Sequence, residues 1–162
     1  MTALDLAIAI IKRWEGCRLV AYPDPGSGGD PWTIGYGATG KGIGPGVKWT
    51  LEQAEGRLER DVQRFMDGVK ERLERYASPP QLAAMTSLAY NIGLTAFGKS
   101  TLLRKFNAGD VDGAAAEFGR WDKASGKRLA GLVKRRADER RLFKSADFSN
   151  VKGGSSSTEE SR

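Results

Sequence analysis

The chain has 162 residues, of which 40% are hydrophobic and 9% aromatic, a size and composition typical of one globular domain or two small lobes. Its single cysteine excludes a disulfide within the chain, and the absence of histidine excludes His-based catalytic triads and the usual zinc sites. The net charge of +6 favours a negatively charged partner.

The first segment, residues 3–13, is predicted to form a helix, because apolar residues recur on one helical stripe. Its continuous apolar run, residues 6–11, is far too short to span a bilayer, and no basic region precedes it as in a signal peptide. We therefore expect a core helix of a soluble protein, without a membrane anchor or a leader.

The next stretch carries two carboxylates and a hydroxyl. Glu15 lies at or just beyond the helix end, Asp24 lies in a loop rich in proline and glycine, and Thr33 lies in the β-type run Trp-Thr-Ile-Gly-Tyr. The pattern predicts a small antiparallel sheet with a loop between its strands. An acid, a carboxylate and a hydroxyl that face one cleft are what acid/base hydrolysis of a glycosidic bond requires. Spacing alone leaves open whether these residues are catalytic or belong to surface turns.

Residues 38–49 are rich in glycine, and one more short strand is predicted around residues 47–49. A capping box, Thr50 to Gln53, then starts a long helix that is predicted to reach residue 76. Apolar residues repeat along it at intervals of three and four, which indicates a core-facing stripe. The members of this stripe are Leu51, Ala54, Leu58, Val62, Met66, Val69, Leu73 and Tyr76.

A second capping box, Ser78 to Gln81, starts a helix that is apolar on most sides and is expected to form the buried centre of a helical lobe. Trp121 is interpreted as a core residue, and stacking on a sugar ring is the alternative. Shorter helices are predicted at residues 100–107, 110–120 and about 129–144, and the polar tail from residue 147 is expected to be flexible.

Positive charge is concentrated in residues 120–144, which contain ten Lys or Arg and three Asp or Glu. Such a segment attracts nucleic acid or an anionic bacterial envelope, although a solvated helix face is the default interpretation. The segment lacks interleaved aromatic residues and no DNA-binding motif is evident, which argues against nucleic acid.

The complete motif is more specific than the spacing. Glu-Gly-x-Arg-Leu-x-Ala-Tyr-x-Asp, followed by Trp-Thr-Ile-Gly-Tyr-Gly, strongly resembles the phage-type lysozymes, the endolysins of tailed bacteriophages. The resemblance covers about residues 3–145 and continues in three later segments, at residues 81–93, 100–104 and 131–140.

This resemblance implies an α+β, lysozyme-like fold in which a small antiparallel sheet lobe is joined by a long helix to a helical lobe, with the active-site cleft between them. It also implies that Glu15 is the general acid and that Asp24 and Thr33 hold and activate the attacking water. Asn91 is a weak substrate-binding candidate, and a helix C-cap is an equally good interpretation of it. Residues 1–146 would then be one catalytic domain, with the sheet lobe at about 15–49, the linking helix at about 50–76 and the helical lobe at about 78–145 plus 3–13.

The implied activity is hydrolysis, with inversion, of the β-1,4 bond between N-acetylmuramic acid and N-acetylglucosamine in peptidoglycan, without a metal or cofactor. One alternative is a lytic transglycosylase, which needs only one acid; the presence of Asp24 and Thr33 argues against it. A second alternative is a non-catalytic module that binds the wall. The chain is expected to be a monomer. An endolysin without a signal or anchor would wait in the host cytoplasm and need a holin to reach the wall.

One departure from the family concerns the loop. The family has five residues between its Asp and Thr, whereas eight separate Asp24 from Thr33 here. The added length introduces a second carboxylate, Asp30, after two glycines. We predict that Asp24 is the working carboxylate and that residues 28–30 belong to a tolerated surface insertion. The cysteine, Cys17, is interpreted as a small, partly buried residue.

Overall fold

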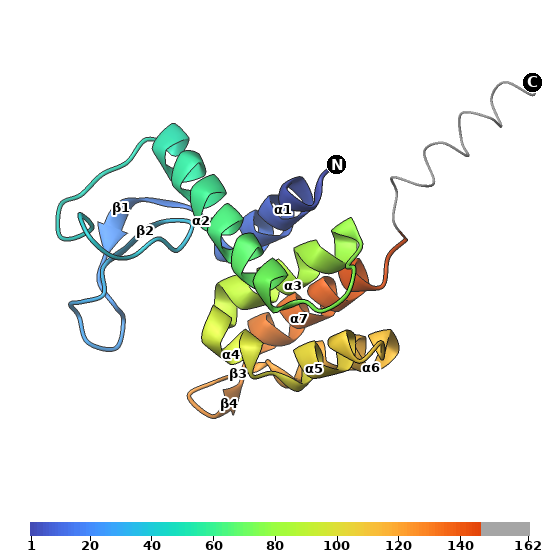
Figure 1. The fold of residues 1–162 in the computed structure, drawn as a ribbon. Helices are drawn as coiled ribbons and strands as arrows, with labels where there is room; N and C mark the ends of the chain where they lie inside the picture. The colour runs from blue at the N-terminus through green and yellow to red at the C-terminus, as the bar shows by residue number, and fades with distance from the viewer. Residues whose placement is uncertain (147–162) are drawn as a thin grey trace, which may run out of the picture. The chain divides into compact units, whose positions relative to one another are not determined.

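A computed structural model describes residues 1–146 as an α+β fold, which confirms the predicted fold class (Figure 1). The predicted flexible tail lies outside the described residues. Two compact units are distinguished, one formed by residues 8–64 and the other by residues 1–7 with the chain from 65 onward. None of the helices within residues 1–146 is both long enough and apolar enough to cross a membrane.

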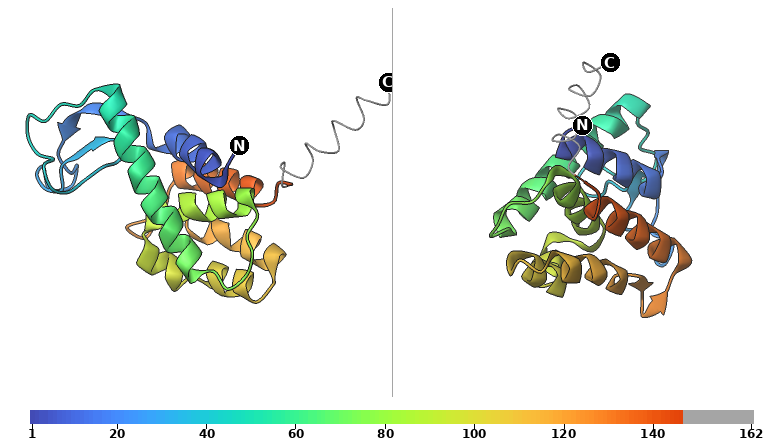
Figure 2. Two further views of the ribbon diagram at one scale, coloured as in Figure 1. Left: turned by 45° about the horizontal axis from the view of Figure 1, so that its top comes forward. Right: turned by 90° about the vertical axis from the view of Figure 1, so that its right-hand side faces the viewer.

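The unit of residues 8–64 is built around a two-stranded antiparallel sheet (Figure 2). Helix α1, Ala3–Glu15, enters this unit and ends where Gly16 takes a positive φ of 67°. Strand β1, Arg18–Tyr22, then pairs with β2, Thr33–Gly35, as predicted. In this pairing Arg18 lies opposite Gly35 and Tyr22 lies opposite Thr33, with a bulge between the two pairs.

The further strand predicted around residues 47–49 forms only in part. The chain here makes a single isolated bridge, between Val20 and Lys48, and two flanking backbone hydrogen bonds to β1 of 2.9 Å. The glycine- and proline-rich sequence bends the chain up to residue 46, so too few residues remain before the next helix to form a longer strand beside β1.

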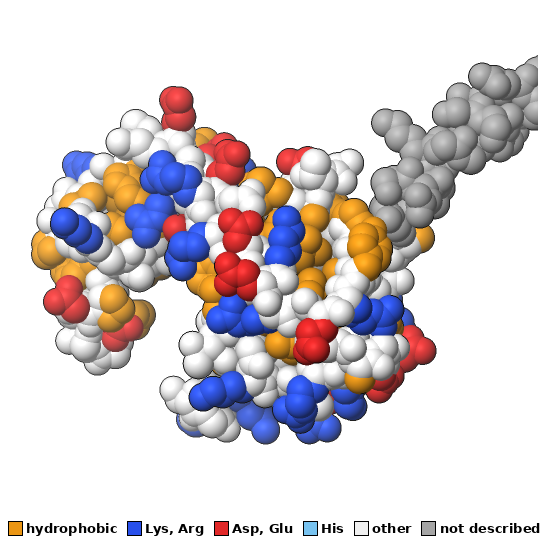
Figure 3. All heavy atoms as spheres, in the orientation of Figure 1, with side chains coloured by type: hydrophobic (Ala, Val, Ile, Leu, Met, Phe, Trp, Pro, Cys, Tyr) orange, Lys and Arg blue, Asp and Glu red, His pale blue; other side chains and the backbone are white. Residues whose placement is uncertain are grey.

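Helix α2, Leu51–Arg72, begins at the predicted capping box. The Thr50 N–H donates to Gln53 Oε1 at 2.8 Å, and the Gln53 N–H donates to Thr50 Oγ1 at 3.1 Å. The predicted stripe is buried from Ala54 to Val69, whereas charged side chains of both signs cover the outer face of the helix (Figure 3). Leu51, the first member of the stripe, is exposed because it precedes the packed part of the helix.

The predicted end of this helix at residue 76 is wrong by one turn. The Asn107 side chain donates to the carbonyl of Arg72 at 3.1 Å and accepts the N–H of Glu74 at 2.9 Å. These bonds satisfy backbone groups at the helix end and turn the chain away. Tyr76, predicted to be a core residue, therefore lies beyond the helix with 74% of its surface exposed.

The unit from residue 65 onward is helical, and α3 is its buried centre, as predicted. The capping box of Ser78 and Gln81 forms at its start, and α3 packs along the last helix, α7 (Figure 1). Phe118 and Phe106 both pack against Phe143, with ring centroids 5.3 and 6.0 Å away. The helical segments are α3 Pro79–Ile92, α4 Leu94–Gly98, α5 Thr101–Asn107, α6 Val111–Glu117, the 3-10 turn η1 Phe118–Arg120, and α7 Ala130–Phe143.

Two elements of this unit were not predicted, α4 and a small hairpin. The hairpin pairs β3, Lys123–Ala124, with β4, Lys127–Arg128. Ser125 and Gly126 between them both have positive φ, 51° and 79°, which is the backbone of a tight two-residue turn. Its strands are short, exposed and charged and carry no alternating apolar pattern, so the sequence does not predict them.

Candidate functional site

Glu15 is the last residue of α1, and its half-buried carboxylate lies against a tight turn. Ile34 and Ala38 exchange both of their backbone hydrogen bonds, at 2.9 and 2.8 Å, and so close a loop of three residues. Gly35 and Gly37 in this loop have φ values of 65° and 90°, a conformation that other residues rarely adopt. A methyl group at position 37 would lie 3.0 Å from Glu15 Oε2, so the glycine leaves room for the carboxylate.

Asp24 closes the loop between β1 and β2. Its Oδ2 accepts the N–H groups of Gly26 at 3.1 Å and Ser27 at 3.0 Å, which is the hydrogen bonding of an Asx turn. Its backbone also binds across the loop: its N–H donates to the carbonyl of Gly29 at 2.9 Å, and its carbonyl accepts the N–H of Gly28 at 2.8 Å. Two hydrogen bonds therefore restrain the half-buried carboxylate itself, and two more fix the Asp24 backbone in the loop.

Thr33 opens β2 and pairs with Tyr22 of β1. Because Asp24 follows Tyr22 by two residues, Asp24 and Thr33 lie at the same end of the strand pair. Glu15, at the end of α1, lies against Gly37 in the turn after β2. The three residues all belong to the unit of residues 8–64, and the two strands and the turn position them.

The second loop carboxylate, Asp30, has a different environment. It is exposed, and among the described residues its carboxylate has no hydrogen bond or ion pair. Its backbone carbonyl accepts the hydroxyl of Ser27 at 3.0 Å. Asp30 is thus fixed through its backbone while its side chain extends to solvent.

Cys17 follows Glu15 by two residues and is exposed, so the prediction of partial burial is wrong. The positive φ of Gly16 directs the chain outward after α1, which leaves Cys17 at the surface. The buried Tyr36 is its hydrogen-bonding neighbour; burial raises the pKa of this phenol, and Cys17 raises it further.

Asn91 lies on the unit from residue 65 onward, and the C-cap interpretation is wrong. Gly93 caps α3, and its N–H donates to the carbonyl of Ala89. Asn91 Oδ1 instead accepts a hydrogen bond of 2.9 Å from Nη1 of Arg136. A guanidinium group only donates, so the amide oxygen of the exposed Asn91 must face Arg136 and its Nδ2 donors point away.

Behind Asn91 is a buried charge cluster that sequence reasoning missed. Glu139 is fully buried and accepts from Arg136 Nη2 at 3.1 Å, from Arg135 Nε at 3.4 Å and from the Ser87 hydroxyl. Burial raises the pKa of the Glu139 carboxyl, whereas Arg136 and Ser87 act in the opposite direction.

This cluster corrects the interpretation of the basic segment as a solvated face for two of its ten cations; the other eight are exposed. Arg135 and Arg136 are only 4% and 1% exposed, because both are drawn inward by Glu139 on the same helix. The signal in the sequence was a glutamate three and four residues after two arginines, a spacing that places all three side chains on one helical face.

A model of the phage lysozyme family matches residues 12–139. The chain is 45% identical over 158 residues to an endolysin of Bacillus phage PZA, covering 98% of this chain and 61% of that protein. The chain spans about three fifths of the length of the Bacillus phage relatives that it matches.

Two solved structures have the same fold. The muramidase domain of SpmX from Asticaccaulis excentricus has a TM-score of 0.78 and 34% identity, covering 86% of this chain and 95% of that one. The endolysin from Escherichia coli O157:H7 phage FAHEc1 has a TM-score of 0.76 and 33% identity, covering 89% and 94%.

Proposed function

Because the chain belongs to the phage lysozyme family, we propose that it is a peptidoglycan hydrolase that cleaves the β-1,4 bond between N-acetylmuramic acid and N-acetylglucosamine. Residues 1–146 act as the catalytic domain. The observation that carries this proposal is the carboxylate of Glu15, held over Gly37 by the tight turn of the Trp-Thr-Ile-Gly-Tyr-Gly motif.

Glu15 is the general acid in this mechanism. Its carboxylic acid protonates the glycosidic oxygen as the bond to the anomeric carbon breaks, so the leaving sugar departs as a neutral alcohol. The backbone of helix α1 and the contact with Gly37 restrict where this side chain lies, which supports its use as a positioned proton donor.

Asp24 and Thr33 position the attacking water on the opposite face of the sugar ring. Asp24 Oδ2 is already engaged by two backbone N–H groups, which leaves Oδ1 to accept a proton from water. The Thr33 hydroxyl, at the same end of the strand pair, orients that water. This mechanism inverts the anomeric carbon and requires the two carboxyl groups to stand about 6.5–9.5 Å apart.

The partners follow from the same proposal. The substrate is peptidoglycan, and the exposed Nδ2 of Asn91 is a candidate donor to it. The net charge of +6 favours approach to an anionic envelope. For cell lysis, the protein would act as a monomer and a holin would release it from the host cytoplasm to the wall.

The test is a zymogram on purified peptidoglycan with Glu15→Gln, which keeps the side-chain shape but donates no acidic proton. We expect activity to fall at least about a hundredfold. Glu59→Gln is the matched control, since Glu59 is an exposed residue of α2 in the same unit. Folded Glu15→Gln that clears the substrate within about tenfold of the parent would exclude Glu15 as the acid.

Mass spectrometry of the released muropeptides tests whether water is the attacking nucleophile. Hydrolysis leaves a reducing end, whereas a transglycosylase leaves a 1,6-anhydro ring that is lighter by one water. A dominant anhydro product would rule out water activation by Asp24 and Thr33.

A further inference from the structure

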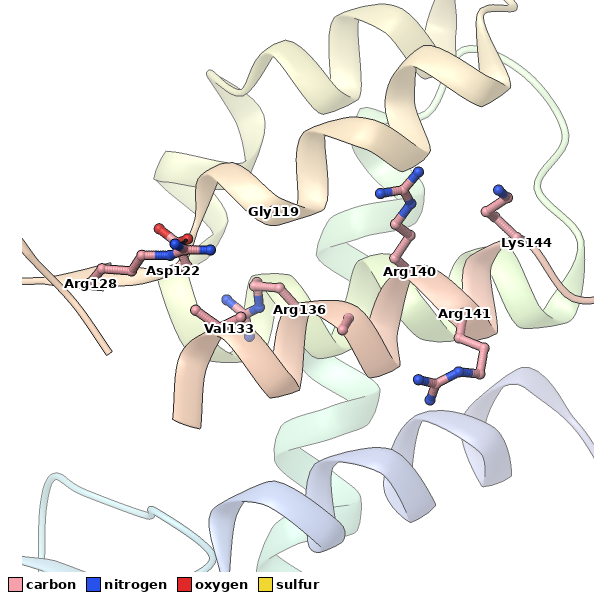
Figure 4. A pocket seen from close by; sticks show the side chains of 9 residues that line it. Gly119, Asp122, Arg128, Val133, Arg136, Arg140, Arg141 and Lys144 are labelled. Atoms are coloured by element: carbon pink, nitrogen blue, oxygen red, sulfur yellow. Dashed lines mark hydrogen bonds and ion pairs between the residues drawn. The ribbon is translucent and has the colours of Figure 1, made fainter. Parts of the chain in front are cut away.

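A hollow of about 380 Å³ lies beside α7, between this helix and η1 (Figure 4). Val133 and Ala137 of α7 supply apolar lining, and Gly119 of η1 lies opposite. Nothing lies within 4 Å of the point where a side chain at Gly119 would begin. The hollow is therefore open space that a side chain or a ligand group can occupy.

Within the part of the chain that the structure describes, five of the lining residues are cations, against a single carboxylate, Asp122. Three of the five already have partners: Arg128 pairs with Asp122 at 2.9 Å, Arg136 belongs to the buried Glu139 cluster, and Arg141 pairs with Asp138 at 3.0 Å. The other two, Arg140 and Lys144, are exposed and have no hydrogen bond from their side chains and no ion pair within residues 1–146. Two positive charges at this hollow thus remain without a counter-charge.

These two charges are spaced along the helix. Arg136, Arg140 and Lys144 follow one another at intervals of four residues, so they lie on one face about 6 Å apart along the axis. Like charges at this spacing repel each other. A ligand with a repeated negative charge would neutralise Arg140 and Lys144 together, whereas a single carboxylate would reach only one of them.

We propose that this hollow, the α7 anion groove, binds a linear phosphodiester polymer of the bacterial envelope, with successive phosphates at Arg140 and Lys144. Guanidinium and ammonium groups are the side chains that bind phosphate best. Among residues 1–146, no aromatic residue lines the groove, so these residues offer no platform on which nucleic-acid bases would stack. The envelope as the source of the polymer rests on the proposed function; the groove and its charges do not.

The test measures binding of purified poly(glycerol phosphate) to the full chain by isothermal titration calorimetry at several salt concentrations. Arg140→Gln with Lys144→Gln should weaken binding at least about tenfold and lower the slope of log K against log salt by about 1.4, or about 0.7 for each lost phosphate contact. The matched control is Lys99→Gln with Lys134→Gln, which removes the same charge from exposed cations of the same unit that do not line the groove. This control should keep both values of the parent.

A second variant leaves every cation in place. Gly119→Glu adds a negative charge at a residue that lines the groove, where nothing lies within 4 Å of the new Cβ, and should also weaken binding about tenfold or more, whereas Gly119→Ser should not. Hydrolysis of peptidoglycan from which the polymer has been removed should stay at the parental level in all these variants, so failure of the groove and failure of the proposed activity are distinguishable.

Three results would overturn the proposal. Equally weakened polymer binding in the groove variant and the control variant would mean that the net charge of the protein, and not the groove, attracts the polymer. Oligothymidylate of equal phosphate number that binds more tightly than the polymer would assign the groove to nucleic acid. Binding to phosphatidylglycerol vesicles without binding to the polymer would assign it to a membrane surface.

Discussion

Glu139→Gln should be among the most destabilising single substitutions in the helical unit, although it preserves the size of the side chain. Glu139 is fully buried, and the two arginines that it neutralises are 4% and 1% exposed. Glutamine still accepts a hydrogen bond from Ser87, but it removes the negative charge that the buried Arg135 and Arg136 share on α7. Removing one partner of such a buried pair costs about 3–5 kcal/mol.

The neighbouring residue on α7 provides the control. Asp138 pairs with Arg141 at a similar distance, 3.0 Å; its own side chain is 12% exposed, but that of Arg141 is 75% exposed. Water reaches the guanidinium and screens this pair, so Asp138→Asn should cost no more than about 1 kcal/mol. The two variants remove the same charge from adjacent positions and differ mainly in the burial of the arginine partner.

Urea unfolding followed by far-ultraviolet circular dichroism measures the difference. With a typical urea dependence of about 2 kcal/mol per molar, Glu139→Gln should lower the unfolding midpoint by about 2 M, against less than about 0.5 M for Asp138→Asn. Replacing Glu139 and both arginines together by methionine should recover most of the loss, because all three buried charges of the cluster are then removed. Equal, small shifts in both single variants, or no recovery in the triple variant, would refute the role assigned to the buried cluster.

Two further predictions concern the site and the end of α2. Gly37→Ala should lower hydrolysis at least about tenfold, because the added methyl group displaces Glu15. Gly42→Ala is the control: its φ of 83° is similar and nothing lies within 4 Å of the new methyl group, so it should match the backbone strain but keep activity. Equal activity of the two variants would exclude the contact between Gly37 and Glu15. Asn107→Ala should lower the free energy of unfolding by about 1–2 kcal/mol, because the carbonyl of Arg72 and the N–H of Glu74 both lose their partner, and an unchanged thermal midpoint would argue against this cap.

The parts of the fold that were predictable are those set by neighbours in the sequence. Both capping boxes form as predicted, because each needs only residues three positions apart. The end of α2 was misplaced because the residue that sets it, Asn107, comes 35 residues after the carbonyl that it binds. The apolar pattern at Tyr76 continued past the helix end and carried no information about that bond.

The sequence proposes the site as a list of residues, but it does not contain their arrangement. The motif around Glu15 and Thr33 named both residues, yet the close approach of Gly37 to Glu15 exists only once the turn of Ile34 and Ala38 has formed. The basic segment was misread for a related reason. Sequence shows the sign of a charge but not its burial, so Arg136 looked the same as a surface arginine.

The choice between Asp24 and Asp30 is the prediction that follows most directly from the loop. Both carboxylates are close to Thr33 in sequence, but Asp24 is held by the backbone N–H groups of Gly26 and Ser27, whereas the Asp30 side chain is exposed and unbonded among the described residues. Water activation requires a carboxylate whose position is restrained to a fraction of an ångström, which favours Asp24.

Asp24→Asn isolates the charge, because asparagine accepts the same two backbone hydrogen bonds and keeps the Asx turn. We expect it to lose at least about a hundredfold in hydrolysis of purified peptidoglycan, while Asp30→Asn stays within a few-fold of the parent. Circular dichroism should show both variants folded. An inactive Asp30→Asn beside an active Asp24→Asn would mean that the loop carries its working carboxylate at the tip, and that the restraint seen at Asp24 serves only to close the loop.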